Sequence, residues 1–156
     1  MGSGKTTIGK ELSNALNMPF IDIDDYIEKK NKITISEMFS IYGEEYFRER
    51  EKEAVKEISS QSGFVIAAGG GTVLCRENVN MLKLNGKIIL LDVSVYNIKQ
   101  RLINDNSRPL LNAKDKENII ENLFSIRHTV YQSVADVVVD GNNSPNKVID
   151  DIIKSL

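Results

Sequence analysis

The chain has 156 residues, enough for one ordinary domain and too few for two, so we expect a single domain over residues 1–156. Its 20 Lys and Arg residues against 22 Asp and Glu residues give a net charge of −2, which excludes a strongly basic surface for nucleic acid or for an anionic membrane. A single cysteine, Cys75, excludes an internal disulfide framework, and no apolar run approaches the length of a membrane-spanning helix, so we expect a cytoplasmic protein that works as a monomer.

Strand-like and helix-like segments alternate along the chain, with short connections between them. A helix pattern follows a Gly-rich N-terminal segment and ends at Met18-Pro19. Strands are predicted at residues 20–23, 64–68, 87–92 and 137–139, and further helices at 26–30, 36–42, 44–61, 76–84, 95–103, 117–131 and 145–156. The Ile-Ile-Leu-Leu run of the third strand predicts burial on both faces. This alternation favours a parallel, doubly wound α/β sheet, in which ligands bind beyond the carboxyl ends of the strands.

The Gly-rich segment at the N-terminus carries the first chemical motif, since Gly4-Lys5-Thr6 matches the second half of G-x-x-x-x-G-K-[ST]. Glycines let backbone N–H groups converge on phosphates, and the helix that follows presents its positive end to them. Lys5 is expected to reach the β and γ phosphates, and the Thr6 hydroxyl to bind Mg²⁺. A plain helix-capping loop is the less favoured alternative, because an amphipathic helix follows at once. The predicted ATP loop is Gly2, Ser3, Gly4, Lys5, Thr6 and Thr7.

The start of the chain is unusual for this motif. The first motif glycine would fall two residues before Met1, and no strand-like segment precedes the loop. About five buried apolar side chains, at about 1.5–3 kcal/mol each, would be lost with such a strand. That loss rivals the stability of a whole domain, about 5–15 kcal/mol. We therefore expect Met1 to be an internal methionine of a longer native protein, with about ten residues preceding it.

Two aspartates, Asp22 and Asp24, bracket Ile23 at the end of the strand predicted at residues 20–23. Alternation along a strand would place both carboxylates on one face. Paired carboxylates beside a phosphate loop suit Mg²⁺ coordination through water and acceptance of a proton from a hydroxyl. The alternative is that one of them caps the next helix, although Asp25 is the better candidate for that cap.

Three further segments are candidates, with unequal strength. Three glycines, at positions 69–71, follow a strand pattern, and their entropic cost suggests a close backbone approach to a ligand rather than a flexible turn. Arg108 lies in a polar segment, 104–114, that is typical of a lid over a bound nucleotide. Arg127 near a helix end is a weak signal alone. His128 has no partner at metal-ligand or triad spacing, so we interpret it as structural.

Together these segments resemble the shikimate kinase family over essentially the whole chain. The matching elements, in order, are G-S-G-K-T-T, F-I-D-I-D-D-Y-I-E, G-E-E-Y-F-R-E-R-E, G-G-G-T-V, S-R-P-L-L and I-R-H-T-V-Y. The resemblance implies a three-layer P-loop kinase fold whose central parallel sheet has five strands in the family, the first of them missing here. It also implies Mg²⁺-dependent transfer of phosphate from ATP to the 3-hydroxyl of shikimate, a step toward chorismate and the aromatic amino acids.

The resemblance also implies roles for particular residues. Asp24 would hold the shikimate hydroxyls and act as base, and Asp22 would hold Mg²⁺ through water beside Thr6. Arg48 and Arg127 would grip the substrate carboxylate, with Glu51 positioning Arg48. The implied catalytic residues are Lys5, Asp24 and Arg108. Further ATP contacts would come from Arg101, Arg108, Asn143 and Pro145, and further shikimate contacts from Phe39, Phe47, Gly69, Gly70 and Gly71.

Two alternatives remain. One is a related small-molecule kinase, such as a gluconate kinase, whose substrate also carries a carboxylate. The other is a non-catalytic or truncated nucleotide-binding relative that kept the fold. Retention of Lys5, Asp24, Arg108 and Arg127 argues against the second alternative, and the shortened start argues mildly for it.

Overall fold

The computed structural model describes residues 2–102 and 116–156. The predicted lid at 104–114, which contains Arg108, lies outside the described residues. By its internal contacts the chain divides into two compact units. The central unit is Gly9–Lys87, and the terminal unit joins Met1–Ile8 to Ile88–Leu156. Each unit is described by itself.

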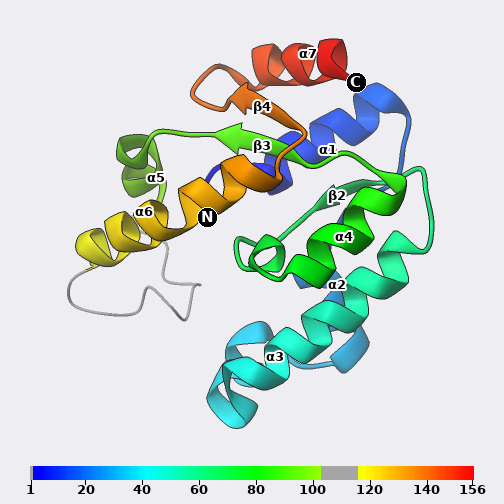
Figure 1. The fold of residues 1–156 in the computed structure, drawn as a ribbon, viewed down its shortest axis with the longest axis vertical. Coiled ribbons are helices and arrows are strands. Elements are labelled where there is room, and N and C mark those ends of the chain that lie inside the picture. Colours follow the sequence, from blue (N-terminus) through cyan, green and yellow to red (C-terminus); the bar gives the residue numbers. More distant parts are fainter. Residues whose placement is uncertain (1, 103–115) are drawn as a thin grey trace. The chain divides into compact units, whose positions relative to one another are not determined.

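The central unit contains two strands, three helices and a 3₁₀ turn, in addition to the last two turns of α1 (Lys5–Leu16) (Figure 1). These elements are β1 (Phe20–Asp22), α2 (Ile23–Asn31), α3 (Ile35–Ser59), β2 (Val65–Ala67), η1 (Thr72–Leu74) and α4 (Arg76–Asn85). β1 and β2 pair in parallel, with Phe20 opposite Val65 and Asp22 opposite Ala67. α3 packs against both α2 and α4.

The core of the central unit lies between α2 and α3. Ile23 and Ile27 are four residues apart on α2 and are fully buried. They meet the apolar stripe of α3, as the helical spacing of that stripe predicts. The buried cluster consists of Ile23, Ile27, Met38, Phe47, Ala54, Val55 and Ile58. Burial of each large member stabilises the fold by about 1.5–3 kcal/mol.

Helix α3 begins and bends where its sequence dictates. Thr34 and Glu37 form a capping box, in which the Glu37 N–H donates to Thr34 Oγ1 at 3.2 Å and the Thr34 N–H donates to Glu37 Oε2 at 2.7 Å. Gly43 has φ 84° and ψ 175°, which kinks the helix. The two helices predicted at 36–42 and 44–61 are therefore two arms of one kinked element.

The terminal unit contains β3 (Ile89–Asp92), α5 (Val95–Leu102), α6 (Lys116–Val134), β4 (Val137–Asp140) and α7 (Pro145–Ser155) (Figure 1). β3 and β4 pair in parallel, with Ile89 opposite Val137 and Asp92 opposite Asp140. α5 packs on α6, and α7 packs on β4. The buried residues between α5, α6 and the end of β3 are Val93, Ile98, Leu102 and Ile120. The parallel pairs confirm the predicted α/β class.

The strands are less buried than the sequence predicts. Residues Ile89–Asp92 of β3 are half-buried rather than buried on both faces, so that prediction is wrong. Within the described residues each strand has one strand neighbour, β1 with β2 and β3 with β4. A strand paired along one edge leaves part of its apolar side chains accessible. No helix in the described ranges combines the length and apolarity needed to span a membrane.

Candidate active site

The triple glycine 69–71 is the centre of a polar cluster in the central unit. It follows β2 and leads into η1. A Cβ atom added to Gly71 would lie 2.3 Å from Nη1 of Arg48, and one added to Gly69 would lie 3.1 Å from Oδ1 of Asp24. The structure therefore brings Asp24 of α2 and Arg48 of α3 to the same glycine segment. The side chains of Arg48 and Asp24 approach these glycines closely, whereas the predicted approach of a ligand to their backbone stays a prediction.

Two carboxylates hold Arg48. Its Nη1 donates to Glu51 Oε2 at 2.8 Å, and its Nε and Nη2 donate to Glu44 Oε1 at 3.2 and 3.0 Å. Burial lowers the pKa of the Arg48 guanidinium, but the hydrogen bonds and charges of Glu51 and then Glu44 raise that pKa by more. The group is therefore a firmly charged cation. Glu51 is 1% exposed. Its hydrogen bond with Arg48 is consistent with the predicted role of Glu51 in positioning that arginine.

Phe39 and Phe47, predicted to line the substrate pocket, form a pair beside Arg48. Their ring centroids are 5.0 Å apart, and the Arg48 Cζ atom lies 5.1 Å from the Phe47 centroid. Phe47 is buried in the core cluster, whereas Phe39 is partly buried against that cluster. The Arg48 guanidinium therefore lies over the Phe47 ring in a cation–π contact.

The strand ends one residue earlier, and the next helix begins three residues earlier, than the sequence predicts. β1 ends at Asp22, and Ile23 is the first residue of α2. Asp22 is the N-cap: its Oδ1 accepts a hydrogen bond from the Asp24 N–H at 3.1 Å. The predictions that both carboxylates share a strand face and that Asp25 is the cap are therefore wrong. Capping by Asp22 satisfies a free helix N–H, and Asp24 lies in the first turn, where the helix dipole favours a carboxylate.

The predicted phosphate loop leads directly into α1 in the terminal unit. Gly2 and Gly4 have φ values of +66° and +86°, a backbone conformation that favours glycine. The Ile8 N–H donates to the Gly4 carbonyl at 2.9 Å, so helical bonding begins immediately after the loop. Thr6 and Thr7 lie exposed in the first turn of α1, and Lys5 is its first residue. This arrangement places the N-terminus of a helix directly after the loop, as anion binding requires.

The residues predicted for adenine contacts all lie in the terminal unit. Arg101, on α5, donates from Nη1 to the Gly2 carbonyl at 3.3 Å, so the structure brings it to the phosphate loop. Asn143 donates from Nδ2 to Asp140 Oδ2 at 3.2 Å. Pro145 is the first residue of α7, after the N-cap Ser144. No described contact joins Asn143 or Pro145 to Arg101, and an adenine site built from all three stays a prediction.

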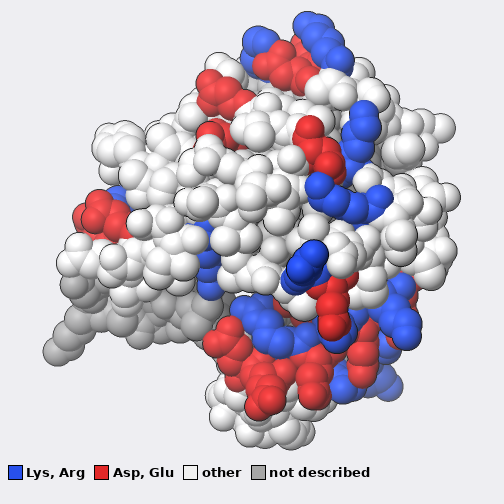
Figure 2. Space-filling model, in the orientation of Figure 1, with Lys and Arg blue, Asp and Glu red and all other residues white. Residues whose placement is uncertain are grey.

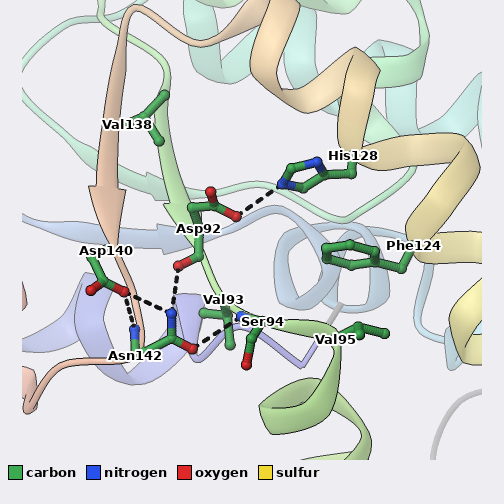
Figure 3. Close-up of a pocket in the computed structure, with 9 residues that line it drawn as sticks. All are labelled: Asp92, Val93, Ser94, Val95, Phe124, His128, Val138, Asp140 and Asn142. Atoms are coloured by element: carbon green, nitrogen blue, oxygen red, sulfur yellow. Dashed lines mark hydrogen bonds and ion pairs between the residues drawn. The ribbon is translucent and has the colours of Figure 1, made fainter.

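Arg127 lies half-buried on α6 in the terminal unit, whereas Arg48 belongs to the central unit. Their shared grip on one carboxylate therefore stays a prediction. The neighbouring His128, interpreted from the sequence as structural, pairs with a carboxylate distant along the chain. Its Nε2 lies 2.9 Å from Asp92 Oδ1, and its ring stacks on Phe124 with centroids 4.7 Å apart (Figure 3). The pair is separated by 36 residues, so spacing along the chain carries no signal for it.

The His128–Asp92 pair lies on the wall of a cavity of about 600 Å³ in the terminal unit (Figure 3). Its lining residues are Asp92, Val93, Ser94, Val95, Phe124, His128, Val138, Asp140 and Asn142. None of the described residues predicted for catalysis or binding lines it. Hydrogen bonds from the backbone and side chain of Asn142, and from the Asn143 side chain, hold the pKa of Asp140 below its ordinary value.

Charged side chains of both signs are interspersed over α3 on the face shown in Figure 2. Lys30 pairs with Glu57, and Arg50 pairs with Glu53 at 3.0 Å. This mixed surface agrees with the near-neutral composition of the chain. It provides no single-sign patch on that face for a polyanionic partner.

A helix N-terminus behind a Gly-Ser-Gly-Lys-Thr loop, parallel strands, and an arginine and a carboxylate gathered at a glycine turn define a P-loop kinase that acts on a small molecule. The chain belongs to the shikimate kinase family, whose model, described as "Shikimate kinase", matches residues 1–156. The resemblance found in the sequence and the predicted enzyme class are thereby confirmed.

Individual relatives agree with this assignment. The chain is 41% identical over 150 residues to the shikimate kinase of Francisella tularensis subsp. holarctica, a match that covers 96% of this chain and 85% of the relative. The solved structure of shikimate kinase from Acinetobacter baumannii in complex with shikimate is 34% identical with a TM-score of 0.94, and the match covers 99% of this chain and 87% of that one. The solved structure of shikimate kinase from Aquifex aeolicus is 36% identical with a TM-score of 0.86, and the match covers 99% of this chain and 90% of that one.

Proposed function

We propose that this chain transfers the γ-phosphoryl group of ATP to the 3-hydroxyl of shikimate and so forms shikimate 3-phosphate. The observation that carries the proposal is the convergence of Arg48 and Asp24 on the triple glycine 69–71. A fixed guanidinium suits the carboxylate of shikimate, and a neighbouring carboxylate suits its hydroxyls. Membership of the shikimate kinase family supports the same substrate.

On the acceptor side, Arg48 binds the shikimate carboxylate together with Arg127. A guanidinium is better suited than an ammonium group because it offers two parallel N–H donors to the two carboxylate oxygens. Asp24 accepts hydrogen bonds from the ring hydroxyls and takes the proton of the attacking one. The backbone of Gly70, between the two glycines that contact Asp24 and Arg48, completes the acceptor site.

On the donor side, the backbone N–H groups of residues 2–7 hold the ATP phosphates at the start of α1. Lys5 balances negative charge on the β and γ phosphates. Arg101, held at the loop by the Gly2 carbonyl, stacks on the adenine with Pro145, and Asn143 contributes a polar contact. Arg108 stabilises the charge of the transferring group.

Magnesium fits the residues that would hold it. Mg²⁺ prefers oxygen ligands and keeps several water and phosphate ligands, so it needs few from the protein. The Thr6 hydroxyl, exposed in the first turn of α1, would bind it directly, and the Asp22 carboxylate would hold it through water. When bound, the ion neutralises charge on the β and γ phosphates.

The test is ADP release in a coupled assay with shikimate, with gluconate and with no acceptor, at saturating ATP and Mg²⁺. We expect turnover with shikimate alone. Turnover with gluconate would assign the chain to a different acceptor. ATP binding without stimulation by either acceptor would identify it as a non-catalytic nucleotide-binding relative.

A further inference from the structure

We infer that Thr72 and Asn78 are positioning residues, which set the affinity of the site for the acceptor by holding Glu51 and, through Glu51, the guanidinium of Arg48. The inference rests on the proposed function, since it assumes that Arg48 binds the acceptor. It adds two residues that do not themselves touch the acceptor in our proposal.

The contacts form one chain of hydrogen bonds. Asn78 Nδ2 donates to the Thr72 carbonyl at 3.0 Å, and Thr72 Oγ1 donates to Glu51 Oε1 at 2.6 Å. The other oxygen of that carboxylate, Oε2, accepts from Arg48 Nη1 at 2.8 Å. The chain thus links the first turn of α4, the start of η1 and helix α3 to the cation of the site.

The three side chains linked by these hydrogen bonds are buried. Asn78, Thr72 and Glu51 are 1%, 0% and 1% exposed. A buried carboxylate is costly unless both of its oxygens have partners. Arg48 supplies one partner and the Thr72 hydroxyl supplies the other. Without the hydroxyl, Glu51 would be driven toward water or toward a new orientation, and Arg48 would move with it.

The direction of the Thr72 hydroxyl is determined by its surroundings. The backbone N–H of Thr72 donates to the Gly69 carbonyl at 3.1 Å, which fixes the backbone at the start of η1. A Cβ added to Gly69 would lie 3.1 Å from Thr72 Oγ1 and 3.5 Å from Glu51 Oε1, so there is little space for another arrangement. A β-branched side chain also has few rotamers. The hydroxyl is therefore held toward Glu51 before any ligand arrives.

Asn78 holds the residue that carries this hydroxyl. Its Oδ1 is buried and has no hydrogen-bond partner among the described residues, so the amide uses only its donor group. An unpaired buried oxygen costs free energy. An amide at this position is nevertheless able to tie α4 to the Thr72 carbonyl, which an apolar side chain of similar size could not do.

Glu44 shows why the buried partner matters. It also pairs with Arg48, but its side chain is 54% exposed, whereas that of Glu51 is 2% exposed. An exposed ion pair is weak and mobile. The buried Glu51 therefore fixes the guanidinium, and a fixed guanidinium binds a carboxylate with less loss of entropy.

The test compares Thr72→Val, which keeps the shape and removes the hydroxyl, with Thr72→Ser, which keeps the hydroxyl. We expect Thr72→Val to raise the KM for shikimate about tenfold, the effect of losing one hydrogen bond to a charged group. The KM for ATP and kcat should change by less than about threefold, and Thr72→Ser should restore the KM for shikimate. A purely structural role would lower the melting temperature without separating KM from kcat.

A second pair of variants keeps the inference testable if Thr72→Val fails to fold. Asn78→Asp removes the amide donor, and Asn80→Asp makes the same change at an exposed position of α4. We expect only Asn78→Asp to raise the KM for shikimate. If the parent enzyme turns over shikimate, an unchanged KM for shikimate in Thr72→Val or Asn78→Asp would overturn this inference. The proposed function would then still stand. A parent without shikimate turnover would overturn the proposed function instead.

Discussion

The two units of the molecule differ in the groups that they offer for ligand binding. In the central unit the polar side chains are buried and bonded to each other, with Glu51 and Thr72 almost inaccessible to water. In the terminal unit the predicted phosphate loop presents backbone groups. The Asp92–His128 pair of the same unit has side chains that are 37% and 25% exposed. A buried side-chain network is sensitive to single atoms, whereas a backbone loop tolerates changes around it. Substitutions in the central unit should therefore affect acceptor binding most strongly.

The largest effect is expected from Asp24→Asn in the central unit. Loss of the proposed general base should lower kcat with shikimate by about 100- to 10,000-fold. ATP affinity, measured by calorimetry, should be nearly unchanged. Asp25→Asn, one residue along the same helix turn, is the matched control and should retain activity. Wild-type turnover in Asp24→Asn would remove Asp24 from its assigned role.

The next effect is expected from Gly71→Ala. The new methyl group would lie 2.3 Å from Arg48 Nη1, so the guanidinium must move. We expect the KM for shikimate to rise about 10- to 100-fold, as for loss of a charged hydrogen-bonded contact. The KM for ATP serves as the internal control, and Gly86→Ala, at the end of α4, as the external one. An unchanged KM for shikimate would show that Arg48 need not be fixed.

A smaller effect, on stability alone, is expected from the His128–Asp92 pair of the terminal unit. His128→Ala should lower the free energy of unfolding by about 1 kcal/mol, the usual worth of one such hydrogen bond. Urea unfolding of His128→Ala, Asp92→Asn and the double variant isolates the pair energy. Thr129→Ala, at an exposed neighbouring position, is the control. A rise in the shikimate KM as large as that of Gly71→Ala would break the contrast between the two units.

The smallest effect is expected from the pH dependence of Asp140. Hydrogen bonds from Asn142 and Asn143 hold its pKa below the ordinary 3.8. A carboxylate with a depressed folded-state pKa contributes stability above that ordinary value and loses it as the pH falls through the folded-state pKa. The stability difference between the wild type and Asp140→Asn should therefore shrink below about pH 4. Urea unfolding at several pH values, with Asp150→Asn as control, measures it; a pH-independent difference would contradict the assignment.

Segments whose role depends on local backbone were predicted well from the sequence. The phosphate loop is recognisable because glycines at positions 2 and 4 adopt positive φ and a helix follows directly. The triple glycine lies close to the side chains of Arg48 and Asp24, and its predicted approach to a ligand stays a prediction. Most strands and helices were located within a few residues, since apolar periodicity and capping residues act over short distances.

The errors occur where a boundary or a distant contact decides. Asp22 and Asp24 were placed on one strand face because alternation alone cannot show that a helix begins at Ile23. For His128, interpreted as structural, the sequence carries no signal of the pairing with Asp92, which lies 36 residues away. The sequence pattern indicates no particular role for Thr72 or Asn78, since a threonine and an asparagine are common residues after a glycine turn.

The sequence by itself therefore determined the class of the protein, its phosphate loop and the residues that mark its family. These features are encoded in short runs, where each residue type meets a local requirement of backbone or charge. The tertiary structure alone decided that Thr72 and Asn78 lie behind Glu51, and that His128 pairs with Asp92. Those outcomes depend on strand register and helix packing, which bring together residues whose separation along the chain has no period.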